Sequence, residues 1–268
     1  MTALAHSISL PGPRLVRAEL LKLRKRRGLV ATVGALTVAA PIVAYGILAI
    51  LHAANPAHHG PAGGVTNLGE GVAVLSTLGA VAATLVGATA GAGDLSAGVF
   101  RELVITGRAR HALFGARIYG GLIFLLTFVA VAYALAAVAT VSFAGSLPAP
   151  SATLLAETGA WLVLSCSFFF ALALGLSSLV GSRSTTIGVL LALRLAVTPI
   201  LISIPALGLG REVLPGAALN RLAPQAMWEF TTQGGVVPMS LPAAELVLVL
   251  WAVCLLAVGG WRTVTRDA

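Results

Sequence analysis

The fold is decided by the stretch RLVRAELLKLRKRR (residues 14–27) and by the apolar run LVATVGALTVAAPIVAYGILAIL (residues 29–51) that follows it directly. The apolar run contains no charge over 23 residues. At ~1.5 Å per residue a helix of this length reaches about 34 Å, which exceeds the ~30 Å hydrocarbon core of a bilayer. The basic stretch and the apolar run together predict a membrane-spanning helix preceded by a basic amphipathic helix on the membrane surface. The basic residues expected to anchor that surface helix are Arg14, Arg17, Lys22, Arg24, Lys25, Arg26 and Arg27.

The composition of the whole chain agrees with a membrane protein. Hydrophobic residues make up 58% of the 268 residues, charged residues only 10%, and the mean hydropathy is +0.97. A soluble domain carries about 25% charged residues. The net charge of +8 could suggest nucleic-acid binding, but the basic residues lie at the ends of apolar runs, where anionic lipid attracts them. We therefore expect membrane lipid as a partner and no nucleic acid.

Six apolar segments follow one another along the chain, so the sequence predicts an all-α integral membrane protein with six spans. We expect a cytoplasmic N-terminal part over residues 1–28, one six-span membrane domain over residues 29–261 and a cytoplasmic tail over residues 262–268. The expected spans are residues 29–51, 69–93, 118–141, 155–180, 185–207 and 241–261.

The distribution of basic residues predicts the orientation. Fourteen basic residues fall on one side of the predicted spans: the seven before the first span, then Arg101, Arg108, Arg110, Arg117, Arg183, Arg262 and Arg266. Only Arg211 and Arg221 fall on the other side, and Arg194 lies within a span. Since cytoplasmic loops carry the excess of Lys and Arg, we predict that both termini are cytoplasmic. An even number of spans agrees with this.

Small residues follow a regular spacing in the second span. Gly79 and Ala83, and again Gly87 and Gly91, are four residues apart, a spacing that lets another helix approach closely. The pattern is compatible with packing inside the chain and with a face for dimerisation.

Catalytic patterns are missing from the sequence. An intramembrane serine protease needs a histidine in a span as the base, and all five histidines lie outside the predicted spans. His52, His58 and His59 share a Pro/Gly-rich loop without a nearby Cys or carboxylate, which favours solvated side chains over a metal site. We therefore expect neither catalytic residues nor a metal or cofactor in this chain.

Nucleotide binding by this chain is excluded in the same way. A phosphate-binding loop needs a lysine directly after a glycine, and the only lysines, Lys22 and Lys25, follow Leu21 and Arg24. If ATP drives this protein, another subunit binds it.

Arg194 is the one full charge deep in a predicted span. A lone arginine at the centre of a membrane helix costs about 2.5–3.5 kcal/mol on insertion scales, so it is expected to face the bundle interior. Glu157, Glu70 or Glu245 could approach it as ion-pair partners from the outer ends of their spans. The sequence leaves open whether Arg194 is structural or lines a substrate path.

A second amphipathic segment follows the second span. Asp94 is suited to cap a helix at its N-terminus and Gly107 to end it, with apolar residues between them at helical spacing. The sequence predicts a short interfacial helix, which serves as a membrane-surface element or as a docking element for a cytoplasmic partner.

The connection between the fifth and sixth predicted spans has an intermediate polarity. Residues 211–235 are too polar to span the membrane and too apolar for a solvated loop, so we expect a pair of short helices dipping into the outer leaflet, with Trp228 near the headgroups.

This order of elements resembles the permease subunits of ABC-2-type transporters. The local matches are Glu19 to Arg27, which resembles the amphipathic elbow helix, and Asp94 to Leu103, which resembles the coupling helix between spans two and three. The short helices between spans five and six match the re-entrant helices of that family. The chain departs from the more common Glu-x-x-x-Gly-Thr pattern, because Val99 follows Ala97 and Gly98 where the family has threonine.

The resemblance implies a function. It implies a permease subunit in the plasma membrane of a bacterium that works in export, without indicating which substrate is transported. ATP and Mg²⁺ would be held by a separate ABC ATPase subunit. It also implies a second permease subunit, either identical or related. The residues expected to couple to the ATPase are Asp94, Gly98, Phe100, Arg101 and Glu102.

Two other classes stay open at this point. An ion-coupled secondary transporter needs carboxylates inside the membrane, whereas the acidic residues here lie near the ends of the spans. A membrane scaffold or an assembly factor that transports nothing is compatible with the same sequence.

Overall fold

The computed structural model describes residues 11–96, 98, 109–227 and 237–265. Every regular element in these ranges is a helix, which confirms the all-α class. In chain order the elements are α1 (Pro13–Lys25), α2 (Arg27–Gly34), η1 (Ala35–Ala39), α3 (Ala40–Ala54), α4 (Val65–Ser96), α6 (Arg110–Ser142), α7 (Ala152–Val180), α8 (Arg183–Ala192), η2 (Leu193–Val197), α9 (Thr198–Ile202), η3 (Pro205–Val213), α10 (Pro215–Arg221), η4 (Gln225–Met227) and α12 (Leu241–Thr265).

Six helices in the described ranges are long and apolar enough to cross a membrane, which confirms the expected number. They cover Arg27–Ala54, Val65–Leu95, Arg110–Ser142, Ala152–Val180, Arg183–Ile202 and Leu241–Thr265. The first and fifth each contain one π-helical turn, η1 and η2, between two α-helical parts. The chain is therefore a multi-pass membrane protein.

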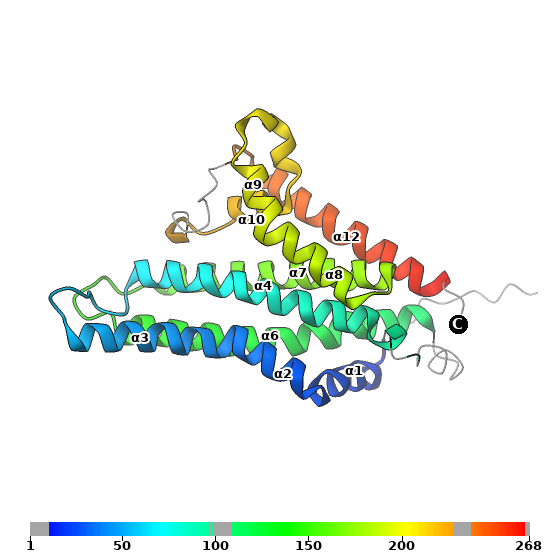
Figure 1. Cartoon of the computed structure of the whole chain (residues 1–268), viewed down its shortest axis with the longest axis horizontal. Coiled ribbons are helices and arrows are strands. Elements are labelled where there is room, and N and C mark those ends of the chain that lie inside the picture. The colour runs from blue at the N-terminus through cyan, green and yellow to red at the C-terminus, as the bar shows by residue number, and fades with distance from the viewer. Residues whose placement is uncertain (1–10, 97, 99–108, 228–236, 266–268) are drawn as a thin grey trace, which may run out of the picture.

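The long helices lie side by side along the long axis of the molecule. Figure 1 shows α3, α4, α6 and α7 running in this direction, with α8, α9, α10 and α12 gathered along one side of them. α4 and α7 form the most extensive contact, α6 packs on α4, and α12 packs on α7. The buried core is built from these helices and includes Phe170, Leu172 and Leu174 of α7.

Glycines make the close contact between α4 and α7 possible. A Cβ on Gly87 would lie 2.5 Å from the carbonyl oxygen of Phe170, and a Cβ on Gly79 would lie 2.8 Å from the Cys166 sulfur. A Cβ on Gly91 would clash with the side chain of Ser177. The small residues of the second span therefore pack against α7 of the same chain, which decides between the two uses that the sequence left open.

The turn between α7 and α8 follows from its two residues. Gly181 adopts a positive φ of 77° and ends α7, a conformation that glycine reaches without steric cost. Ser182 then caps α8, because its hydroxyl accepts a hydrogen bond from the Thr185 amide at 3.3 Å. These two residues alone connect α7 to α8.

The connection between the fifth and sixth spans folds back onto the bundle. The residues of α10 from Pro215 to Leu219 are buried, and α10 packs on α12. The indole of Trp161 donates to the Leu219 carbonyl at 3.0 Å, and that of Trp251 donates to the Val213 carbonyl at 3.0 Å. Short helices are therefore present in this connection, whereas their entry into the outer leaflet stays a prediction, and Trp228 lies outside the described residues.

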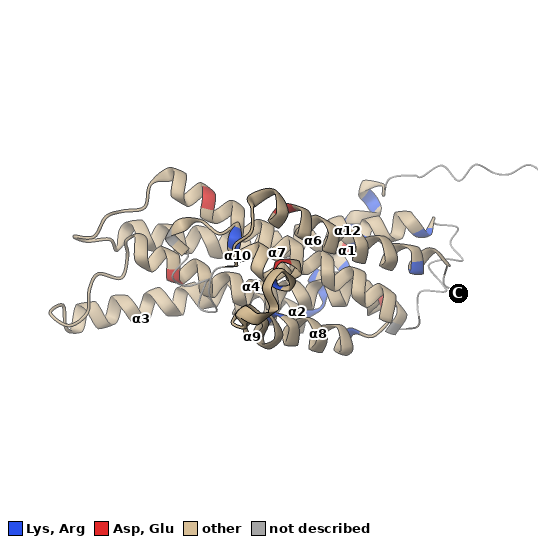
Figure 2. Ribbon diagram, turned by 90° about the horizontal axis from the view of Figure 1, so that it is seen from above, with Lys and Arg blue, Asp and Glu red and all other residues tan. Residues whose placement is uncertain are grey.

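Several helix ends meet at one end of the bundle. Arg110 at the start of α6 donates to the Val264 carbonyl at the end of α12 at 2.8 Å, and α1 packs on α6. Figure 1 places α1 and the end of α12 toward the same end of the molecule. Figure 2 shows that charged residues are sparse along the helices and that several basic ones lie toward this end. We refer to it as the basic end.

Candidate functional site

Four charged side chains from three helices meet at the basic end. The Lys22 ammonium of α1 contacts Asp94 Oδ1 of α4 at 2.8 Å and Glu19 Oε2 of α1 at 2.7 Å. The Arg117 guanidinium of α6 donates from Nη2 to Asp94 Oδ2 at 2.8 Å. We call Glu19, Lys22, Asp94 and Arg117 the charge cluster.

The cluster is buried, so its charges depend on one another. The side chain of Asp94 is 3% exposed and that of Arg117 is 1% exposed, whereas Lys22 at 32% reaches solvent. Removing one partner of a buried pair leaves an uncompensated charge, which costs about 3–5 kcal/mol. Two acids and two bases give the cluster no net charge, so it can be buried as a unit.

The position of Asp94 in its helix makes these cations necessary. Asp94 lies in the last turn of α4, where the helix dipole disfavours a negative charge. Lys22 and Arg117 approach it from two other helices, and Arg117 Nη1 also donates to the Gly91 carbonyl at 3.4 Å. The end of α4 is thus fastened to both α1 and α6.

Close packing of α1 on α6 brings Glu19 and Lys22 to this place. A Cβ on Gly120 would lie 2.8 Å from the Glu19 Cβ and 3.2 Å from the Val16 carbonyl oxygen. A Cβ on Gly115 would lie 3.2 Å from the Pro11 ring. These two glycines in α6 provide the surface on which the basic amphipathic helix rests.

The structure corrects the expected role of Asp94 in its local helix. Asp94 does not cap the N-terminus of a new helix, because α4 continues through Ser96. Gly98, with a positive φ of 70°, donates its amide to the Leu95 carbonyl at 3.1 Å and lies just after the end of α4. The other residues expected to couple to a partner, Phe100, Arg101 and Glu102, lie outside the described residues.

The seven predicted anchoring residues differ in their exposure. Arg14, Arg17, Arg24, Lys25 and Arg27 are exposed on α1 and the start of α2, as a role at the membrane surface requires. Lys22 differs, because it turns inward to Asp94 and Glu19. Arg26 is half-buried, and a Cβ on Gly93 would lie 3.2 Å from its guanidinium.

Arg194 does not form the ion pair that the sequence suggested. Within the described ranges its guanidinium lies over the Phe169 ring, 5.6 Å from the centroid, and its buried Nε has no hydrogen-bond partner. Glu157 is exposed near the start of α7. It precedes Phe169 by 12 residues, about 18 Å along a helix, which is too far for a direct pair. The Arg194 side chain belongs to the π-helical turn η2, a form of helix that is frequent at functional sites.

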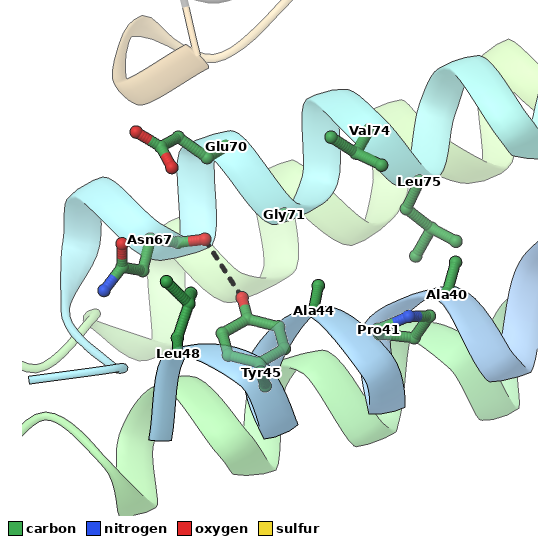
Figure 3. A pocket seen from close by; sticks show the side chains of 10 residues that line it. All are labelled: Ala40, Pro41, Ala44, Tyr45, Leu48, Asn67, Glu70, Gly71, Val74 and Leu75. Atoms are coloured by element: carbon green, nitrogen blue, oxygen red, sulfur yellow. Dashed lines mark hydrogen bonds between the residues drawn. The ribbon is translucent and has the colours of Figure 1, made fainter. Parts of the chain in front are cut away.

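A small pocket between α3 and α4 also contains polar groups (Figure 3). Its volume is about 110 Å³, and the Tyr45 hydroxyl donates to the Asn67 carbonyl at 3.0 Å and accepts from the Thr140 hydroxyl at 2.9 Å. The Glu70 carboxylate points away from Tyr45. The hydroxyls are thus engaged in joining α3, α4 and α6, and we assign the pocket to packing.

Sequence reasoning missed the joint role of Glu19, Lys22 and Arg117. It treated Lys22 as one of seven anchoring residues and Arg117 as one of fourteen basic residues on the predicted cytoplasmic side. The available signal was Arg117 itself, since no other charge follows it in α6, and Asp94 is the only aspartate before Asp267. Isolated charges of opposite sign at the ends of consecutive apolar helices favour a pair.

Comparison with known proteins adds no family to this description. The sequence matches none of the protein-family models and none of the curated proteins with which it was compared.

Proposed function

We propose that the chain is the permease subunit of an ABC-type transporter, working in export with a separate ATPase subunit. The ATPase would hold ATP and Mg²⁺, and a second permease subunit would complete the pathway. The charge cluster carries this proposal. It supports a function in which the connection between α4 and α6 receives a force and passes it to the spans.

The cluster is suited to that function by its place in the chain. Asp94 lies in the last turn of α4 and Arg117 two turns into α6, so the pair joins the two helices at 2.8 Å close to the connection between them. Lys22 adds α1 to the same joint. A movement of residues 97–109 would therefore act on α1, α4 and α6 together. Phe100, Arg101 and Glu102 within this connection are the proposed contacts with the ATPase.

The sequence supports a separate motor. Neither lysine follows a glycine, so the chain lacks a phosphate-binding loop, and Lys22 is held in the charge cluster. ATP hydrolysis would then depend on the partner.

The outer surfaces of the fifth and sixth spans are compatible with contact to a second membrane subunit. Val189 and Leu195 on α8 and η2, and Val249 and Val253 on α12, are large apolar side chains that are about half exposed. Lipid or a second subunit would cover them. In the proposed assembly Arg194 faces the pathway, where water or an anionic group of the substrate supplies the partner that it lacks among the described residues.

Purification of the tagged full-length chain from its native membrane tests the proposal. We expect an ATPase subunit to co-purify and its hydrolysis rate to depend on the charge cluster. Asp94→Asn should uncouple or release the ATPase. Arg183→Gln, which removes an exposed charge at the start of α8, is the matched control and should retain both the co-purifying ATPase and its hydrolysis rate. Co-purification of no ATPase, or flux in liposomes driven by a proton or sodium gradient without ATP, would contradict the proposal.

A further inference from the structure

A groove runs between α1 and α6. Its volume is about 490 Å³, and it is largely open to its surroundings. Pro13, Val16 and Leu20 form one wall and Tyr119 and Ile123 of α6 the other, and Arg17 is the charged residue in its lining. The structure therefore has an apolar groove with a cation beside it.

The charges around the groove select the class of its occupant. Arg17 is exposed and, among the described residues, has no acidic ion-pair partner. Arg24 follows it by seven residues, two turns along the same face of α1, and Arg14 precedes it by one turn. A ligand with a negative headgroup and an apolar chain complements both the groove and this row of cations.

The location of the groove agrees with such a ligand. Tyr119 is 51% exposed and Ile123 is 47% exposed near the start of the third span, and tyrosine favours the level of lipid headgroups. The excess of basic residues predicts that this end lies on the cytoplasmic side, where the membrane surface is anionic. The groove thus opens where phospholipid headgroups and acyl chains meet.

We infer that the groove between α1 and α6 binds one anionic phospholipid of the inner leaflet. An acyl chain lies between Val16, Leu20 and Ile123, and the phosphate binds the Arg17 guanidinium, which can donate two hydrogen bonds to it. This inference is independent of the proposed transport function, since it depends only on the groove, its charges and the predicted orientation in the membrane.

Two other occupants fit the charges less well. Residues 1–10 precede the groove in sequence but contain no carboxylate to neutralise Arg17. A second copy docking here by two-fold symmetry would bring the same basic α1 against itself, which like charges oppose. A phospholipid supplies both the charge and the apolar chain.

Native mass spectrometry of the delipidated full-length protein tests the binding. Dioleoyl phosphatidylglycerol should bind more tightly than dioleoyl phosphatidylcholine. Arg17→Gln should weaken the phosphatidylglycerol affinity about fivefold, because a basic residue near a membrane surface contributes ~1 kcal/mol. Ile123→Trp should fill the groove and reduce the binding of both lipids. Arg183→Gln and Ile47→Trp, at an exposed isoleucine of α3, are the matched controls and should bind as the unchanged protein does.

Photo-crosslinking identifies the occupant directly in the same full-length chain. With p-benzoylphenylalanine in place of Tyr119, the expected product is a covalent adduct with phosphatidylglycerol. A crosslink to residues 1–10 or to a second copy, in place of the lipid adduct, would overturn the inference. Equal affinity for phosphatidylglycerol and phosphatidylcholine would overturn it as well. So would an equal loss of lipid binding in Ile123→Trp and Ile47→Trp.

Discussion

At the scale of single residues, Asp94 is the most consequential side chain. It is 3% exposed, and both its carboxylate oxygens are held by cations from other helices. Asp94→Asn leaves Arg117 buried beside a neutral amide, so we expect the free energy of unfolding to fall by about 3–5 kcal/mol. Thermal unfolding in detergent measures this change.

The matched variants show whether charge is the cause. Asp94→Glu keeps the charge and should lose less stability than Asp94→Asn. Arg183→Gln removes an exposed charge and should change stability by less than about 0.5 kcal/mol. If Asp94→Asn is as stable as Arg183→Gln, the cluster does not hold the basic end together.

Substitution of Gly87 tests the close contact between α4 and α7. Its Cβ would lie 2.5 Å from the Phe170 carbonyl oxygen and 2.8 Å from the Ala173 Cβ, so Gly87→Ala forces the helices apart. We expect a loss of about 1–3 kcal/mol in the free energy of unfolding. Gly46→Ala in α3 is the control. Nothing lies within 4 Å of its Cβ, so the higher helix propensity of alanine should leave stability equal or slightly raised. Equal stability of both variants would contradict the packing.

At the scale of elements, the docking of α1 depends on Gly120 of α6. A larger side chain there would meet the Glu19 Cβ and the backbone of Val16 and Leu20, none of which can move without shifting α1. We expect Gly120→Val to loosen α1 and to speed tryptic cleavage after the basic residues between Arg17 and Arg27, measured by limited proteolysis in detergent.

The control for this experiment is Gly28→Ala in α2. Nothing lies within 4 Å of its Cβ, so its cleavage rate should match that of the unchanged protein. Unaltered cleavage in Gly120→Val would mean that α1 is held by contacts other than its packing on α6.

The helices that cross the membrane could be predicted from the sequence, whereas the contacts between them could not. The apolar run of residues 29–51 predicted its span well, because length and the absence of charge determine whether a helix can cross a bilayer. The pairing of Lys22 with Asp94 joins residues 72 apart, and such contacts depend on how helices pack rather than on local pattern. The pairing of Arg194 with Glu157, one of the possibilities that the sequence left open, does not form. The reason is the same, since the sequence does not reveal which residues of two helices lie at the same level in the bundle.

At the scale of the whole molecule, the orientation in the membrane is the property that the proposed function needs most. Charge distribution predicts that α1 and the end of α12 face the cytoplasm, whereas the connections between α3 and α4 and between α6 and α7 face outward. The contact of Arg110 with Val264 agrees with one shared end for the start of α6 and the end of α12.

Cysteine labelling in intact cells measures this orientation. In a Cys254→Ser background the remaining Cys166 is buried. Ser146→Cys then places an exposed thiol in the connection before α7, and Arg183→Cys places one at the start of α8, beyond the other end of α7. A membrane-impermeant maleimide should label Ser146→Cys in intact cells and Arg183→Cys only after permeabilisation, because the excess of basic residues keeps the Arg183 side in the cytoplasm. The reverse pattern would place the charge cluster outside, where no ATP-driven partner could reach the connection between α4 and α6.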